Sequence, residues 1–125
     1  MLVDSDVLIW YLRGEARAAE FLARIAQPRI SAVSYMELAQ GCRNKEELAR
    51  LKRDLELRRA AILPVNEAIS GRAVALIEAH ALASGLLLAD ALIGATALEH
   101  ALPLATGNSK HFAAIEGLTI HAFAR

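Results

Sequence analysis

The sequence predicts an α/β fold in which a central parallel sheet of short strands is flanked by helices. Short apolar runs alternate with longer stretches whose apolar residues recur at helical spacing, the pattern of strand–helix–strand units. The chain is 55% apolar but only 5% aromatic, which suits small-residue helices packed closely on a sheet. Its 125 residues are enough for one domain, 1–125, with a hydrophobic core of its own.

Charge and cysteine content limit the classes of function. The 14 basic and 14 acidic residues cancel, so nucleic acid could be attracted only by a local patch. The single cysteine, Cys42, cannot form an internal disulfide, which suits a reducing compartment. The first apolar segment is acidic rather than basic, unlike a signal peptide, and no apolar run approaches the roughly 18 residues of a membrane span. We therefore expect a cytoplasmic protein without membrane association.

The first half of the chain is predicted to contain three strands and four helices. Apolar runs give the strands, and apolar residues three or four apart give the helices. Pro28 ends one helix, and the next is predicted to start at Ser34, because Ser34 and Glu37 have capping-box spacing, and to stop near Gly41. In chain order these elements span residues 1–3, 7–12, 15–27, 29–33, 34–41, 45–61 and 62–65.

The second half is predicted to contain three helices and two strands. Asn66 caps a long helix that ends at Gly85, and a brief linker, 86–88, precedes a helix opened by Asp90. Gly107 and Asn108 form the turn after the penultimate strand. Because short strands alternate with helices, the sheet should be parallel and covered on both faces. These elements span residues 66–84, 90–100, 102–106, 110–115 and 118–120.

Three acidic residues lie near junctions between predicted elements. Asp4 ends the first strand, Glu37 lies in the helix after the second strand, and Asp90 opens an apolar helix. Brought together, three carboxylates would repel each other and raise each other's pKa values. A hard divalent cation such as Mg²⁺ or Mn²⁺ relieves this repulsion. Such a cation can also polarise a phosphoryl oxygen and activate water, which phosphodiester hydrolysis requires.

Each of these acids also has a local structural explanation, which the residues alone leave open. Asp4 or Asp6 could cap the first helix, and Asp90 could interact favourably with its helix dipole. Glu37 could be the capping-box partner of Ser34. The evidence for an acidic site is therefore the set of acids together with the pattern around them.

That pattern resembles the PIN-domain family, in particular the VapC toxins of bacterial toxin–antitoxin pairs. The resemblance covers essentially the whole chain in the family's order, and its first and third blocks are the most specific. Its four blocks are Val3–Gly14, Ile30–Gly41, Asp90–Ala97 and Leu104–Phe112.

The resemblance implies a PIN-like three-layer sandwich and a metal-dependent endoribonuclease that hydrolyses RNA phosphodiester bonds as the toxin of such a pair. Asp4, Glu37 and Asp90 match the family's most regular acids and would be the catalytic residues and the ligands of Mg²⁺ or Mn²⁺. The family also implies three partners: an RNA substrate, a cognate VapB-like antitoxin and a second copy of the chain in a homodimer.

The last block departs from the family pattern. A fourth acid is often found there, whereas this chain has Asn108 and His111, which supports one cation and leaves a second open. Arg13 and Lys110 are candidates for contact with RNA phosphates. The residues expected to orient the ligands or the substrate are Asp6, Ser5, Ser34, Thr106 and Asn108.

Three other interpretations remain at this point. A PIN-like module could bind RNA or protein without catalysis, having lost turnover with the fourth acid. A haloacid-dehalogenase-type phosphatase also carries an Asp-x-Asp motif like Asp4 and Asp6, but it needs a later Lys and acidic pair, and only Lys110 is present. A receiver-type signalling domain needs its acceptor Asp at a strand end, whereas Asp90 lies in a helical pattern. Transfer of a phosphoryl label to Asp4 would favour either of the last two.

Overall fold

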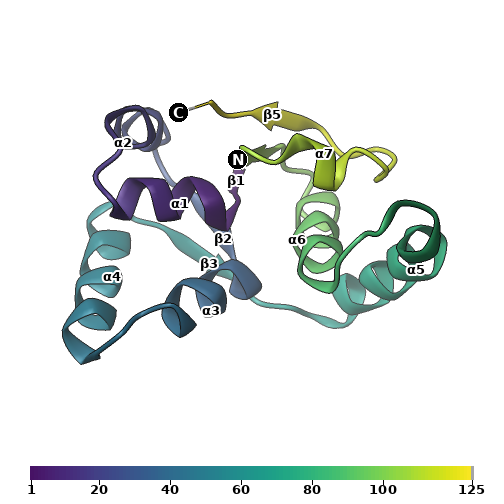
Figure 1. Ribbon diagram of the computed structural model, residues 1–125, viewed down its shortest axis with the longest axis horizontal. Helices are drawn as coiled ribbons and strands as arrows, with labels where there is room; N and C mark the ends of the chain where they lie inside the picture. The colour runs from purple at the N-terminus through teal and green to yellow at the C-terminus, as the bar shows by residue number, and fades with distance from the viewer. Residues whose placement is uncertain (125) are drawn as a thin grey trace.

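The computed structural model describes residues 1–124 and contains one sheet whose neighbouring strands are all parallel. The strand order is β3-β2-β1-β4-β5, so the first strand lies at the centre of the sheet (Figure 1). The parallel α/β prediction is confirmed. The strands are Leu2–Val3 (β1), Arg29–Ser31 (β2), Ala61–Leu63 (β3), Leu104–Thr106 (β4) and Ile120–Ala122 (β5).

Seven helices connect these strands within the described residues. Most begin at a side-chain cap: Asn44 and Asn66, for example, accept hydrogen bonds from backbone N–H groups three residues on. None of the described helices is both long enough and apolar enough to cross a membrane. The helices are Ser5–Leu12 (α1), Ala16–Ala23 (α2), Ala32–Gln40 (α3), Lys45–Leu57 (α4), Glu67–Ser84 (α5), Leu88–Glu99 (α6) and Ser109–Phe112 (α7).

The sheet separates two hydrophobic clusters. Leu2 belongs to the cluster with α5, α6 and α7, whereas its neighbour Val3 belongs to the cluster with α1, α2, α3 and α4. Successive side chains of a strand point to opposite faces, so two apolar residues of β1 reach both clusters. Figure 1 shows α1, α2 and α4 on one side of the molecule and α5 and α6 on the other. The result is the expected arrangement of helix, sheet and helix layers.

Several element boundaries differ from the sequence prediction. The helix predicted over 15–27 ends at Ala23, the helix predicted from Asp90 begins at Leu88, and the last strand lies two residues later than expected. The predicted helix start at Ser34 is wrong, because Ser31 is the cap and its Oγ accepts a hydrogen bond from the N–H of Val33. β2 is correspondingly shorter than predicted.

The topology brings residues from opposite ends of the sequence to one edge of the sheet. β1 pairs with both β2 and β4, and Val3 is in register with Ala105. The next residues along, Asp4 and Thr106, therefore lie side by side where these two strands end. Parallel sheets place their sites at this carboxyl edge.

Candidate active site

Asp4 is the central carboxylate of this edge and is almost fully buried, with 6% of its surface exposed. It follows β1 and caps α1. Its Oδ1 accepts hydrogen bonds from the Ser5 backbone N–H at 2.8 Å and from the Ser5 hydroxyl at 3.3 Å. Its Oδ2 accepts a hydrogen bond from the Thr106 hydroxyl at 2.7 Å. Hydrogen-bond donors to both oxygens fix the orientation of the carboxylate. Asp4 therefore caps α1 and is at the same time available to a site at this edge of the sheet.

Thr106 lies fully buried at the end of β4. Its hydroxyl oxygen accepts a hydrogen bond from the Asn108 backbone N–H at 3.0 Å. That hydroxyl has one proton, which is donated to Asp4. Thr106 thus couples the turn after β4 to the carboxylate after β1.

Glu37 reaches the same site from α3 through Ser5. The Ser5 hydroxyl lies 3.1 Å from Glu37 Oε1 as well as 3.3 Å from Asp4 Oδ1, and its single proton is shared between these two acceptors. The capping-box explanation of Glu37 is wrong, because α3 is capped by Ser31. Ser34 is buried, and its hydroxyl has no hydrogen-bond partner within residues 1–124.

Asp6 accepts three hydrogen bonds from nitrogen donors. Its Oδ1 accepts from the Val7 backbone N–H at 2.7 Å, and its Oδ2 accepts from the Gly107 backbone N–H at 2.9 Å and from the Asn108 side-chain amide at 3.1 Å. Burial and the neighbouring charge of Asp4 nevertheless raise the pKa of Asp6 to about 6. Burial and the Asp4 charge therefore raise the pKa of Asp6 more than its hydrogen-bond donors lower it.

Asp90 lies in the first turn of α6, as predicted. Burial raises the pKa of Asp90, and the charge of Asp4 adds to this rise, while His111 opposes it. The imidazole Nδ1 of His111 lies 3.9 Å from Asp90 Oδ2. Asp4 therefore interacts unfavourably with both Asp6 and Asp90, so each of these two carboxylates lies within electrostatic range of Asp4.

This arrangement fits a divalent cation held partly by water. Among the described residues, no three His, Cys, Asp or Glu side chains are close enough to form a complete ligand cluster. Mg²⁺ requires none, because it retains several waters and is usually bound by one or two carboxylates. Asp4 and Asp90 are the residues that could hold such an ion, with Glu37 acting through water. A cation would also offset both the burial that mainly raises the pKa of Asp90 and the repulsion from Asp4 that adds to it.

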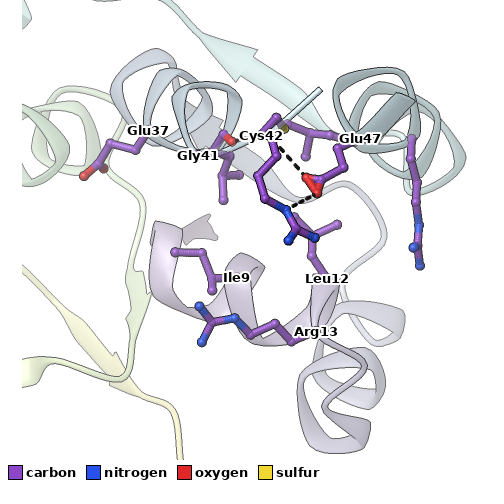
Figure 2. Close-up of a pocket in the computed structure, with 11 residues that line it drawn as sticks. Ile9, Leu12, Arg13, Glu37, Gly41, Cys42 and Glu47 are labelled. Atoms are coloured by element: carbon purple, nitrogen blue, oxygen red, sulfur yellow. Dashed lines mark hydrogen bonds and ion pairs between the residues drawn. The ribbon is translucent and has the colours of Figure 1, made fainter. Parts of the chain in front are cut away.

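The two predicted phosphate-contact residues lie outside this network. Lys110 is exposed on α7 and forms no hydrogen bond or ion pair with the acids, within the part of the chain that the structure describes. Arg13, at the end of α1, lines a groove of about 510 Å³ between α1, α3 and α4. Figure 2 shows Glu37 at one side of this groove, with its carboxylate directed away from Arg13 and Cys42. The groove and the acidic site therefore adjoin only through Glu37.

Sequence reasoning missed one close approach at the site. A Cβ atom on Gly107 would lie 2.5 and 2.7 Å from ring atoms of Trp10 and 2.8 Å from Asp6 Oδ2, so only glycine fits there. The sequence signalled a turn at Gly107 but not what packs against it. The sequence placed His111 in the block where the family often has a fourth acid, but it gave no signal that His111 lies beside Asp90.

Comparison with known proteins identifies the family. The family model described as PIN domain matches residues 1–118. This chain belongs to the PIN domain family. A relative, Ribonuclease VapC10 of Mycobacterium tuberculosis, is 40% identical over 124 residues, covering 94% of this chain and 90% of the relative.

Solved structures agree with this PIN-domain assignment. A toxin–antitoxin complex from Klebsiella pneumoniae contains a chain that is 32% identical, with a TM-score of 0.80 and 98% of both chains covered. FitAcB from Neisseria gonorrhoeae matches with 28% identity, a TM-score of 0.76 and 96% of both chains covered. The PIN assignment sets aside the phosphatase and receiver-type interpretations.

Proposed function

We propose that this PIN-domain chain is a metal-dependent endoribonuclease, acting as the toxin of a toxin–antitoxin pair. The observation that carries the proposal is the buried Asp4 carboxylate, which is fixed on both oxygens and lies within electrostatic range of Asp90. The 40% identity to a ribonuclease over nearly the whole chain supports RNA as the substrate.

Mg²⁺ or Mn²⁺ is the proposed cofactor, with Asp4 and Asp90 as direct ligands and Glu37 as a water-mediated one. When bound, the cation supplies electrostatic stabilisation of the phosphoryl oxygens and a more acidic water. The chain's own residues hold the geometry: Thr106 and Ser5 orient the Asp4 carboxylate, and Ser5 also contacts Glu37. Hydrolysis forms one P–O bond from water and breaks one ester P–O bond, and the leaving ribose oxygen takes up a proton.

The proposed protein partners are an antitoxin and a second copy of the chain. The groove between α1, α3 and α4 is lined by apolar residues, including Leu12, Leu38 and Leu51, and by side chains of both charges, which suits a segment of an antitoxin. Chains from toxin–antitoxin complexes are among the structural relatives. In a homodimer, which the family implies, the second copy would cover apolar residues that are exposed on the single chain. These residues are Met36, Leu57, Ile62, Val74, Leu82, Leu87 and Leu88.

A cytoplasmic location would place this nuclease with its RNA substrate. It also suits the free thiol of Cys42, which lines the groove and stays reduced in that compartment.

The test is cleavage of total RNA by purified, antitoxin-free protein in the presence of Mg²⁺ or Mn²⁺. We expect cleavage that EDTA abolishes, that added metal restores and that Asp90→Asn lowers by at least about 100-fold. Glu99→Gln is the matched control, because Glu99 lies at the other end of α6 and pairs with Arg72 away from the acids. RNA binding without cleavage by the wild-type protein would refute the proposed ribonuclease activity and favour a non-catalytic PIN-like module that binds RNA.

A further inference from the structure

Four aromatic rings form a continuous row beside the acidic site. The ring centroids of Trp10 and Phe123 lie 5.6 Å apart. Those of Phe123 and Phe21 lie 5.3 Å apart, and those of Phe21 and His121 lie 5.6 Å apart. These separations are typical of aromatic rings in direct contact. The chain is only 5% aromatic, yet this aromatic row contains its single tryptophan and two of its three phenylalanines.

The aromatic row is assembled from α1, α2 and the end of β5. Phe21 lies on α2, His121 lies in β5, and the Phe123 backbone N–H donates to the Thr106 carbonyl at 2.8 Å. Because Phe123 continues the pairing of β5 with β4, its side chain points to the same face of the sheet as that of His121. Both rings contact Phe21, and Figure 1 shows the end of the chain beside α2.

One end of the aromatic row touches the turn at the acidic site. A Cβ on Gly107 would lie 2.5 and 2.7 Å from ring atoms of Trp10 and 2.8 Å from Asp6 Oδ2. The other end, His121, is exposed on β5, which is an edge strand of the sheet. The other three residues of the row are partly exposed. The row therefore leads from the acidic site to the outer edge of the sheet.

Two cations lie beside the aromatic row at α2. Arg17 and Arg24 are four residues before and three residues after Phe21, which places them on the same helix face as Phe21. Both are exposed, and neither forms an ion pair with another of the described residues. They outnumber the one acid of α2, Glu20. Aromatic rings that stack bases, with cations that contact phosphates, are the combination that binds single-stranded nucleic acid.

We propose that the aromatic row is a stacking platform for unpaired bases of the RNA strand that the acidic site cleaves. The inference rests on the proposed function for its substrate. Because adjacent rings touch, a base lies on the outward side of a ring and not between two rings. Stacking is tolerant of sequence, since every base has a π-face. A duplex offers no unpaired base, so the platform selects single-stranded RNA.

The single tryptophan lies in the aromatic row and provides a direct signal of stacking. Its fluorescence is followed while metal-free protein in EDTA is titrated with a short oligoadenylate, so that binding is measured without cleavage. We expect the oligoadenylate to quench Trp10. A strand of equal length with abasic ribose units and a duplex of the oligoadenylate with oligouridylate should both quench it much less. Equal quenching by either of these, or no quenching by the oligoadenylate, would overturn the proposal.

Substitutions of His121 separate stacking from charge, and its exposed position allows replacement without a change in the core. We expect His121→Leu to raise the Kd for oligoadenylate by about 5- to 10-fold, as for the loss of one stacked base. His121→Tyr keeps an aromatic ring without an imidazole and should bind within about 2-fold of the wild type. A tyrosine variant as weak as the leucine variant would overturn the proposal. His100→Leu is the matched control, because His100 is exposed at the end of α6 away from Asp90 and should leave binding unchanged.

The RNA assay distinguishes failure of the platform from failure of the proposed function. We expect the loss in His121→Leu to appear in KM and not in kcat, because the platform binds the strand and does not touch the reacting phosphate. A fall in kcat with a wild-type Kd for oligoadenylate would overturn the proposal. If the wild-type protein cleaves no RNA, the proposed function fails by itself, and quenching of Trp10 still decides whether the row stacks bases. If RNA is cleaved but Trp10 is not quenched, only the platform fails.

Discussion

Removing one hydroxyl, by Thr106→Val, tests the central contact of the site. Valine keeps the shape of threonine but cannot donate to Asp4 Oδ2, which Thr106 now does at 2.7 Å in a fully buried position. A hydrogen bond to a charged group contributes about 1.5–3 kcal/mol. The Asn108 N–H also loses its acceptor, but Asn108 is exposed and water can replace it. We therefore expect the free energy of unfolding to fall by about 2–3 kcal/mol.

The measurement is urea denaturation of the metal-free protein, with Thr96→Val as the matched control. Thr96 is equally buried, but its hydroxyl donates to the Leu92 carbonyl one turn earlier in α6. That carbonyl is also positioned to accept the helical N–H bond, so we expect this variant to lose less than about 1 kcal/mol. For a chain of this size, the Thr106→Val loss corresponds to a decrease in Tm of roughly 6–12 °C.

The same pair of variants makes a prediction for catalysis. We expect Thr106→Val to lower the rate of RNA cleavage by about 10-fold and Thr96→Val to leave it unchanged. If the two variants unfold within about 0.5 kcal/mol of each other, the Thr106 hydroxyl does not stabilise a charged Asp4, and the reasoning is refuted.

Three further predictions concern the surroundings of Asp4. Gly107→Ala should destabilise the fold by about 1–3 kcal/mol in thermal unfolding, because its Cβ would overlap the ring of Trp10. The control is Gly71→Ala, in open space on α5, which should raise stability by about 0.5–1 kcal/mol. Equal changes in stability for the two variants would contradict the close packing of Gly107. Because the pKa of Asp6 is raised to about 6 from 3.8, the metal-free fold keeps a proton that the unfolded chain has lost, so this group's contribution to stability should fall as pH rises from 4 to 6. After discounting for solvent exposure, the change is on the order of 1 kcal/mol, and it should be absent when Asp6→Asn is denatured across the same range. Ser5→Ala should lower RNA cleavage several-fold and Ser5→Thr should retain it, because the hydroxyl bridges two carboxylates; identical rates would exclude that bridge.

The sequence carried enough information to predict the layers and the parallel sheet. Apolar runs such as Met1–Val3 and caps such as Asn66 are local signals, and the structure confirms strands and helices at those places. Local signals were weaker at boundaries. Ser31 and Ser34 are both suitable caps, and the sequence favoured Ser34, since Glu37 lies three residues later. The structure instead uses Ser31, which leaves Glu37 free to accept from Ser5.

The site was predictable as a set of residues but not as a geometry. Asp4 and Asp90 stood out because acidic residues interrupt apolar segments. The contact between Asp4 and Thr106 spans 102 positions, and it follows from strand order and register, which no local pattern encodes. The role of Gly107 depends in the same way on tertiary packing against Trp10. Local patterns therefore identify the residues of the site, whereas the strand order and register of the sheet determine which of them are in contact.

The central place of β1 has a consequence for synthesis of the chain. β1 is translated before the other four strands, and its neighbour β4 comes about a hundred residues later. While a ribosome is still adding residues before Leu104, the nascent chain has Asp4, Ser5 and Glu37 but lacks the strand that carries Thr106. A chain truncated at that stage lacks Thr106 and cannot complete the hydrogen bonds to Asp4. A potentially harmful nuclease would thus stay unassembled until translation has passed its fourth strand.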